Sequence, residues 1–300
     1  MRELVVLSGK GGTGKTSLTA SFAVLAEQSV IADCDVDAAD LHLVLAARVK
    51  RREEFRAGHE AAITPKLCTG CGLCQERCRF DAVRAEAADT DRRRFSIDTS
   101  ACEGCGVCVR SCPERAIDFR ERTSGEWYVS DTRCGPMVHA RLGIAAENSG
   151  KLVSLVRRQA REIAEREGRG LLLVDGPPGI GCPVIASLTG TSAALVVTEP
   201  TLSGEHDLQR VLTLTRHFKV PAAVCVNKWD LNPEMAARME RGARAAGAWN
   251  AGRVRYDRGV TEAQISACTV VETGAPSGND IRDLWSALDG FLGGMHGSRG

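Results

Sequence analysis

Nearly continuous apolar runs alternate along the chain with segments in which apolar residues recur at helical spacing. Such runs are typical of strands that are buried on both faces of a parallel sheet. They span residues 2–8, 29–33, 171–175, 193–197 and 222–227. Helical spacing is clearest over residues 16–28 and 152–167. Strands that alternate with helices predict a doubly wound, mostly parallel α/β sheet.

A cysteine-rich segment interrupts this α/β pattern. The pattern changes to a charged stretch after Leu45 and resumes after Gly125. Within the interruption, residues 68–83 and 102–117 repeat each other over sixteen positions. We therefore predict a small α+β domain inserted into a split α/β domain. The predicted boundaries are residues 1–58, 59–122 and 123–300.

Composition limits the classes of partner and compartment. Lys plus Arg total 39 and Asp plus Glu total 38, so the chain lacks the basic excess of nucleic-acid binders. Aromatic residues make up only 4%, which disfavours base stacking. No apolar run approaches the about 18 residues that span a bilayer, and no signal peptide is recognisable. We expect a cytoplasmic protein with no nucleic-acid partner and no stable membrane insertion. In that reducing compartment the 13 cysteines indicate metal or redox chemistry.

A glycine-rich loop, Gly9-Lys-Gly-Gly-Thr-Gly-Lys-Thr16, follows the first predicted strand and opens the first predicted helix. Backbone N–H groups of such a loop point at phosphate oxygens, and the helix N-terminus adds to the attraction. Lys15 is expected to reach the β- and γ-phosphates, and the Thr16 hydroxyl to ligate Mg²⁺. Asp175 ends an apolar strand and is expected to hold the same Mg²⁺ through water. The predicted nucleotide-binding residues of the loop are Gly9, Gly11, Gly12, Thr13, Gly14, Lys15, Thr16 and Ser17.

Each half of the cysteine repeat has the C-x2-C-x2-C-x3-C spacing of bacterial two-cluster ferredoxins. Three cysteines of one run converge on one 4Fe–4S cluster, and the fourth ligand comes from the other run. Zinc sites are the alternative, but zinc motifs seldom use four cysteines at these intervals. The predicted ligands are Cys68, Cys71, Cys74 and Cys112 for one cluster and Cys102, Cys105, Cys108 and Cys78 for the other.

A second lysine in the loop, Lys10, makes it resemble the deviant phosphate loop of the MinD/ParA superfamily of ATPases. That superfamily includes the nitrogenase iron protein and the Mrp-type cluster carriers. The whole chain resembles members with an inserted ferredoxin domain, which are often labelled cobyrinic acid a,c-diamide synthase-like. The similarity extends to residues 135–143, 147–153, 175–183 and 198–201.

This resemblance implies roles for several residues. Lys10 would reach across a nucleotide-dependent homodimer to the ATP of the second copy, where a cation stabilises the charge of phosphoryl transfer. Asp35 would position the attacking water, and Asp33 would support the Mg²⁺ shell or that water. The expected catalytic residues are thus Lys10, Lys15 and Asp35, with Thr16, Asp33 and Asp175 at Mg²⁺.

The segment Asn227-Lys-Trp-Asp230 follows a predicted strand and resembles the N-K-x-D motif that reads the nucleobase. In GTPases the aspartate of this motif selects guanine, whereas in MinD-like ATPases an asparagine at this place contacts adenine. We expect ATP, because the phosphate loop is of the ATPase type.

Cys134 and Cys182 suggest a speculative third cluster. In the nitrogenase iron protein, a cysteine at a place similar to that of Cys182 binds a cluster that bridges two subunits. Cys134 would be the second ligand. The alternative is that both are ordinary buried thiols.

These features predict an ATP-binding and ATP-hydrolysing iron–sulfur protein that couples its nucleotide state to electron transfer to a partner protein. The expected cofactors are ATP, Mg²⁺ and two 4Fe–4S clusters. The expected partners are a redox or metallocofactor-carrying protein and a second copy of the chain. The alternative function is an ATP-dependent scaffold or carrier for iron–sulfur or metallocofactor assembly.

Overall fold

The computed structural model describes residues 1–86, 93–143 and 149–294. The chain forms two compact units. The sheet unit comprises Met1–Glu53, Glu126–Leu142 and the chain from Ser149 onward. The cysteine unit comprises Glu54–Gly125 and a short segment that begins at Gly143. Residues 147 and 148, part of the family similarity, lie outside the described residues.

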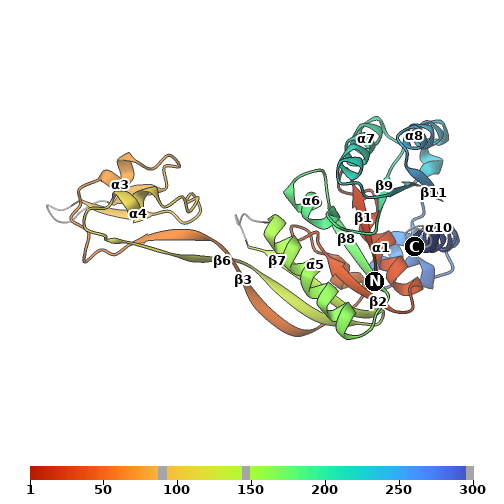
Figure 1. Ribbon diagram of the computed structural model, residues 1–300, viewed down its shortest axis with the longest axis horizontal. Helices are drawn as coiled ribbons and strands as arrows, with labels where there is room; N and C mark the ends of the chain where they lie inside the picture. Colours follow the sequence, from red (N-terminus) through yellow and green to blue (C-terminus); the bar gives the residue numbers. More distant parts are fainter. Residues whose placement is uncertain (87–92, 144–148, 295–300) are drawn as a thin grey trace. The chain divides into compact units, whose positions relative to one another are not determined.

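The sheet unit has the predicted α/β architecture with a mostly parallel sheet. Among the described residues the sheet has nine strands, in the order β11-β10-β9-β1-β8-β2-β7-β6-β3 (Figure 1). The pairs from β11 to β7 are parallel. The strands are β1 (Arg2–Ser8), β2 (Ser29–Asp33), β3 (Arg48–Ile63), β6 (Ile117–Thr132), β7 (Gly135–Leu142), β8 (Leu171–Pro178), β9 (Ala193–Thr198), β10 (Ala222–Asn227) and β11 (Trp249–Val254).

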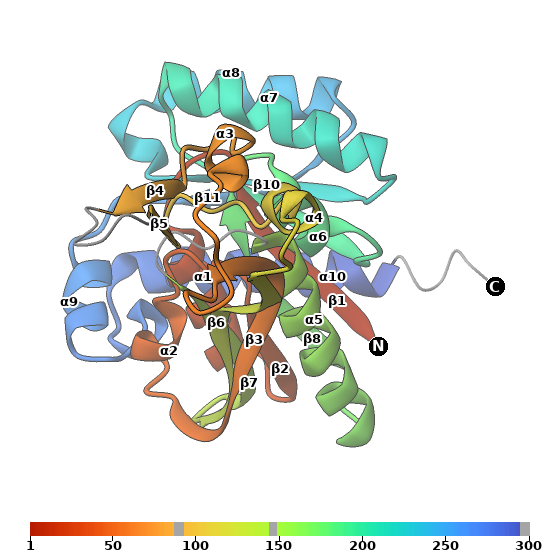
Figure 2. The same cartoon turned by 90° about the vertical axis from the view of Figure 1, so that its left-hand side faces the viewer.

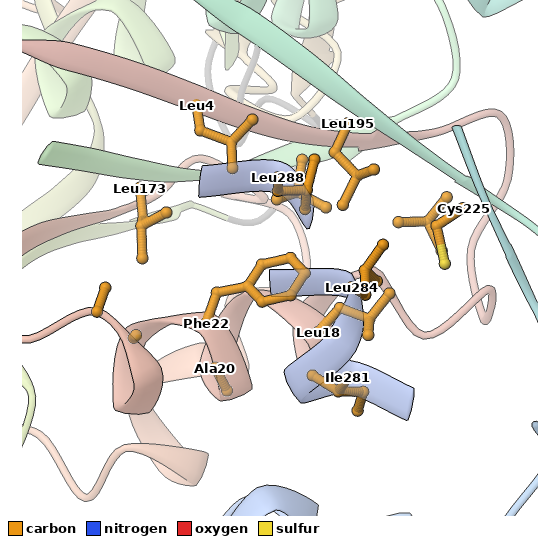
Figure 3. Close-up of a cluster of buried hydrophobic side chains, with 14 of the residues drawn as sticks. Leu4, Leu18, Ala20, Phe22, Leu173, Leu195, Cys225, Ile281, Leu284 and Leu288 are labelled. Carbon is orange, nitrogen blue, oxygen red and sulfur yellow. The ribbon is translucent and has the colours of Figure 1, made fainter. Parts of the chain in front are cut away.

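Two helices, α1 (Lys15–Leu25) and α10 (Pro276–Gly294), pack against one face of the sheet. In Figure 3 the side chains of Leu18 and Phe22 lie among those of Leu284, Leu288 and the sheet residue Leu4. Helix α1 ends at Leu25, before the predicted residue 28, because Ala26 adopts extended backbone. The sheet unit also has the short helices α2 (Leu41–Val44), α9 (Gly259–Ile265), η1 (Trp229–Leu231) and η2 (Val270–Glu272).

The opposite face of the sheet is covered by helices that contribute nothing to the core under α1 and α10. They are α5 (Ser149–Arg166), α6 (Cys182–Leu188), α7 (Leu202–His217) and α8 (Pro233–Ala245). Figure 2 shows α7 and α8 side by side. Strand residues that alternate with those facing α1, such as Val5 and Leu172, point to this second face.

Strands β3 and β6 were not predicted from the sequence pattern. Each has 16 residues, and each runs from the sheet unit into the cysteine unit. Most side chains of β3 before Phe55 are exposed, so the chain shows no alternation of apolar and polar residues there. For this reason the charged stretch after Leu45 was not predicted to be a strand.

The cysteine unit has an internal twofold repeat in its backbone. Helices α3 (Leu73–Glu76) and α4 (Val107–Ser111) each begin after a left-handed glycine, Gly72 or Gly106. Thr64 N–H donates to the Ala116 carbonyl at 2.7 Å, and Asp98 N–H donates to the Ala82 carbonyl at the same distance. Strands β4 (Val83–Glu86) and β5 (Arg94–Ile97) form an antiparallel pair. The sequence repeat is thus a repeat of structure.

No helix within the described ranges is long and apolar enough to cross a membrane.

Candidate functional site

The glycine-rich loop lies at the carboxyl edge of the parallel sheet, directly after β1. Strand β1 lies between β8 and β9, where the strand order reverses, and such a position is where open α/β sheets bind ligands. Gly14, the residue before α1, has a left-handed φ of 89°. A Cβ at this position would lie 2.3 Å from Nδ2 of Asn227, so the close approach of this loop to β10 requires glycine.

Lys15, Thr16 and Asp175 meet at this edge. The Lys15 ammonium donates to Oδ1 of Asp175 at 2.9 Å and lies 3.4 Å from Oδ2 of Asp35. The Thr16 hydroxyl donates to Oδ2 of Asp175 at 2.8 Å. Burial opposes the charge on Lys15, but Asp175 and then Asp35 outweigh it and raise the lysine pKa. The predicted phosphate-site residues are thus brought together.

Thr19 also belongs to this cluster, although the sequence analysis did not include it. Its hydroxyl lies 3.0 Å from Oδ1 of Asp175 and is buried. Residues four apart on a helix share a face, so Thr19 lies on the same face of α1 as Lys15. Helical spacing from the loop lysine could have indicated it.

Asp33 is fully buried beside this cluster. One carboxylate oxygen accepts the Asp35 N–H at 3.2 Å, and the other, Oδ2, has no hydrogen-bond partner among the described residues. Burial, reinforced by the charge of Asp175, raises the Asp33 pKa well above its usual value. Lys15 pairs with Asp35 and Asp175, and the charge of Asp33 adds a little to the rise of the lysine pKa. Carboxylates therefore outnumber the lysine here, and carboxylate oxygens are ligands that Mg²⁺ prefers.

Lys10 lies in a second ion-pair cluster, centred on Glu199. The Lys10 ammonium is 2.6 Å from Oε1 of Glu199 and donates to the Ser203 hydroxyl at 3.0 Å. Lys228 pairs with the other oxygen of Glu199 at 3.1 Å and donates to the Gly12 carbonyl at 2.9 Å. Burial acts against ionisation of Glu199, but the two lysines prevail and lower its pKa. Glu199 follows β9 and was recognised in the sequence only as part of the family similarity.

A pocket beside the glycine-rich loop is lined by Asn227, which the sequence predicted to contact the nucleobase. Its lining includes Gly12, Gly14, Ser17, Asn227 and Tyr256. Nδ2 of Asn227 donates to the Thr13 carbonyl at 2.7 Å, which fixes the amide against the loop.

Asp230, the other base-reading residue, is engaged elsewhere. Its Oδ1 accepts the backbone N–H of Tyr256 at 2.7 Å. Asp230 therefore holds the segment after β11 in place, and it is not among the residues that line the pocket beside the loop.

The cysteines predicted for the first cluster surround one cavity in the cysteine unit. Cys68, Cys71, Cys74 and Cys112 all line it, together with apolar residues that include Ile63 and Phe95. The Ala116 N–H donates to Sγ of Cys112 at 3.3 Å. Burial raises the pKa of Cys74, and the nearby thiols of Cys68 and Cys71 add to that rise. The four thiols that the sequence predicted as one ligand set thus line one cavity.

The cysteines of the second set are also gathered. Burial raises the pKa of Cys108, and the nearby thiols of Cys102 and Cys105 add to it. Cys78 packs against the same small apolar core as Cys102 and Cys108. Across residues 1–86, 93–143 and 149–294, no three His, Cys, Asp or Glu side chains converge as they would on one metal ion. A cubane cluster has its four thiolates at separate corners, so its ligands are spread around a cavity instead of meeting at one point.

The structure does not bring Cys134 and Cys182 together. Cys134 directly precedes β7, at the amino edge of the sheet, where Gly135 lies beside Ser29 at the start of β2. Cys182 opens α6, beyond the carboxyl end of β8. Because β2, β7 and β8 are parallel, the two cysteines lie at opposite edges of the sheet. They cannot ligate one cluster within a single chain.

Comparisons with known proteins agree with this fold. An uncharacterized protein of Methanocaldococcus jannaschii, MJ0578, is 32% identical over 234 residues, which cover 77% of this chain and 79% of the relative. The septum site-determining protein MinD of Pyrococcus horikoshii, solved with Mg-ADP, shares the fold with a TM-score of 0.58 at 15% identity, covering 98% of each chain. MinD in the MinC:MinD cell division complex of Aquifex aeolicus has a TM-score of 0.57 at 17% identity, covering 97% of this chain and 96% of that one.

The family comparison covers most of the chain and confirms the predicted MinD/ParA relationship. Residues 4–269 match the CobQ/CobB/MinD/ParA nucleotide binding domain, a stretch that runs from β1 through the cysteine unit to the last turn before α10. The chain belongs to the CobQ/CobB/MinD/ParA family of nucleotide-binding domains.

Proposed function

We propose that this protein is an ATPase that uses its nucleotide state to control electron transfer to a partner protein through two 4Fe–4S clusters. The observation that carries the proposal is the presence of two ligand sets in one chain. One is the Lys15–Asp175 cluster at the glycine-rich loop, and the other is the cavity lined by four cysteines. Membership in a nucleotide-binding family supports the first part.

In the ATP site, each residue of the loop cluster has a separate task. Lys15 neutralises the β- and γ-phosphates, and the Thr16 hydroxyl supplies an oxygen to Mg²⁺. Asp175 holds the metal shell from its buried position at the end of β8. The unpartnered oxygen of Asp33 supports a role for this residue in the same shell. Asp35, less buried than Asp33, orients the attacking water.

The contacts of the base-reading segment favour ATP over GTP. A GTPase aspartate must face the base with a free carboxylate to accept hydrogen bonds from guanine. Asp230 instead accepts from the Tyr256 backbone. Asn227 lines the pocket, and although its Oδ1 accepts the Lys228 N–H and one N–H of its amide is held by Thr13, the second N–H of the amide is left to donate to adenine.

The two cysteine sets would hold the clusters, which supply one-electron transfer when bound. Cys68, Cys71, Cys74 and Cys112 form the first ligand set, and Cys102, Cys105, Cys108 and Cys78 form the second. The hydrogen bond that the Ala116 N–H donates to Sγ of Cys112 places partial positive charge near one thiolate. Such hydrogen bonds raise the reduction potential of a cluster. Cys71 and Cys105 are exposed, which leaves each set open to a partner.

We also propose that the active form is a homodimer, with Lys10 of each copy contacting the nucleotide of the other. Lys10 lies in the loop that follows β1, and its side chain is only half-buried, which supports this role. The MinC:MinD complex is a precedent within the same fold for a partner protein.

An anaerobic redox titration monitored by electron paramagnetic resonance tests the proposal. Purified protein is titrated without nucleotide, with ADP and with a non-hydrolysable ATP analogue. We expect two 4Fe–4S signals, at least one of which changes potential or line shape with the analogue. The Lys15→Ala variant should keep both signals and lose their response to nucleotide. Two signals that never respond, together with transfer of intact clusters to an apo-acceptor, would favour the carrier function over electron transfer.

A further inference from the structure

We propose that three stacked rings, from His42, His139 and Tyr128, position the segment that carries Asp35 and connect it to strand β6. His139 belongs to the similarity segment 135–143, for which the proposed function gives no task. Through this stack, nucleotide binding would alter the two strands, β6 and β3, that continue into the cysteine unit. The inference rests on the proposed ATP site.

The three rings are nearly parallel and come from three elements. The rings of His42, on α2, and His139, on β7, have centroids 5.1 Å apart and planes inclined by 7°. The rings of His139 and Tyr128, on β6, have centroids 4.9 Å apart and planes inclined by 18°. His139 is therefore the middle ring, and it joins helix α2 to strand β6.

His139 is fixed in place and uncharged. Its side chain is only 5% exposed, and its Nε2 lies 2.9 Å from the Ser130 hydroxyl on β6. Burial, with a smaller effect of His42, lowers the His139 pKa to about 4. A neutral imidazole at neutral pH lets the two histidine rings stack without charge repulsion.

His42 is held more loosely than His139. Its Nδ1 is buried and has no hydrogen-bond partner among the described residues. Ring stacking contributes about 0.5–1.5 kcal/mol, so the His42 ring can shift on His139 at a modest cost. This is the property required of a contact that changes with nucleotide.

The stack is close to the acidic residues of the ATP site in both sequence and space. Asp33 and His139 are register partners on the parallel strands β2 and β7. The Leu142 N–H, at the end of β7, donates to the Val36 carbonyl at 3.2 Å. The chain from Asp33 to Val36 is thus held on β7 at both ends, and residues 37–40 lead from there to α2, whose Leu41 and Val44 are buried. A movement of Asp35 must be taken up either at α2 or at β7.

On its other side the stack continues to β3. The Tyr128 hydroxyl donates to Oε2 of Glu126 at 2.6 Å. The other oxygen of Glu126 pairs with Arg52 on β3. The rings are therefore connected to both strands that run out of the sheet unit.

Hydrogen exchange of the full-length protein, measured by mass spectrometry, tests this connection without relying on activity. Exchange of the β6 segment 126–132 is compared without nucleotide and with a non-hydrolysable ATP analogue. We expect slower exchange with the analogue in the native chain. His42→Ala should lose most of this change while binding the analogue within about twofold of native affinity. His42→Phe retains a ring and should retain the change. His217→Ala replaces an exposed histidine of α7 and serves as the matched control.

The outcomes separate the two proposals. If the native chain does not bind the analogue, the proposed ATP site fails. If it binds the analogue but exchange in 126–132 stays the same, or if His42→Ala responds like the native chain, the stack has no positioning role. Should His42→Ala be misfolded, Tyr128→Leu removes the outer ring from the opposite side and is expected to show the same loss, whereas a native response from that variant overturns the inference.

Discussion

Glu199 shows how a single residue can oppose dimer formation. It pairs with Lys10 at 2.6 Å and with Lys228 at 3.1 Å. If Lys10 acts on the nucleotide of a second copy, it must leave Glu199. Partly exposed ion pairs contribute about 0.2–1 kcal/mol. A dimer releases two such pairs, about 0.4–2 kcal/mol in all. Glu199→Gln should therefore lower the dissociation constant of the ATP-dependent dimer by about two- to thirtyfold, since 1.4 kcal/mol corresponds to a factor of ten.

Analytical ultracentrifugation with a non-hydrolysable ATP analogue measures this effect. Lys228→Met is the matched control, because it removes the other partner of Glu199 and leaves the Lys10 pair in place. An unchanged dimerisation midpoint in Glu199→Gln would show that Lys10 is not restrained by Glu199.

His139 predicts a dependence of stability on pH. Its pKa is lowered to about 4 by burial, whereas an unfolded histidine has a pKa of about 6.5. Between these values the unfolded chain binds a proton that the folded chain does not, so the free energy of unfolding falls as the pH falls from 6.5 towards 4. The full contribution, reached below the folded pKa, is about 3 kcal/mol.

This effect is isolated by comparing the native chain with His139→Asn. Urea unfolding at pH 7 and pH 4.5 should show a smaller loss of stability at low pH in the variant. Other titrating groups act on both proteins and cancel in the difference. Equal losses in the two proteins would mean that His139 is protonated in the folded chain.

At the scale of the element, the crossed ligand sets of the two cysteine runs predict the iron content of each cysteine variant. Cys112 lies in the second run but lines the cavity of the first set. Cys112→Ser should therefore remove one cluster, so that iron falls from about eight to about four per chain. Cys134→Ser and Cys182→Ser are matched controls outside the cysteine unit and should retain about eight. Iron analysis of anaerobically purified protein measures this. Full iron in Cys112→Ser would contradict the crossed assignment of ligands.

Elements whose chemistry is local in sequence could be predicted from it. The glycine-rich loop, the parallel strands around it and the two cysteine runs each place their functional groups within a few residues of one another. Their backbone geometry follows from short-range rules, such as glycine at the left-handed positions of Gly14, Gly72 and Gly106. The family comparison confirms the α/β nucleotide-binding fold.

Features that depend on contacts between distant segments could not be predicted in the same way. The Lys10–Glu199 pair joins the loop after β1 to the residue after β9, and the His42–His139–Tyr128 stack joins three elements. No spacing rule connects such residues. Strand β3 was missed for another reason, because a strand with exposed side chains on both faces lacks the alternation by which strands are recognised.

At the scale of the whole molecule, the two units differ in how they are stabilised. The sheet unit has an extensive core that includes Leu4, Phe22 and Leu288. Among the described residues, the apolar cluster of the cysteine unit is much smaller, and its buried members are Ala61, Cys74, Val83, Phe95 and Ile117. Such a small core supplies little hydrophobic stabilisation, so the proposed clusters would supply much of the rest.

Removal of the clusters should therefore unfold one unit and spare the other. We expect that iron chelation under reducing conditions will make residues 54–125 sensitive to trypsin, which has Arg77, Arg79 and Arg110 as exposed cleavage sites there. The sheet unit should remain resistant and bind ATP with an affinity within about threefold of the native value, because its core and its phosphate loop lie in a separate unit. Limited proteolysis and calorimetry of ATP binding on the same sample measure both effects. If residues 54–125 stay resistant after all iron is lost, the small apolar core is sufficient by itself. If ATP binding is lost together with the iron, the clusters stabilise the sheet unit as well, and the two units cannot be treated as independent in stability.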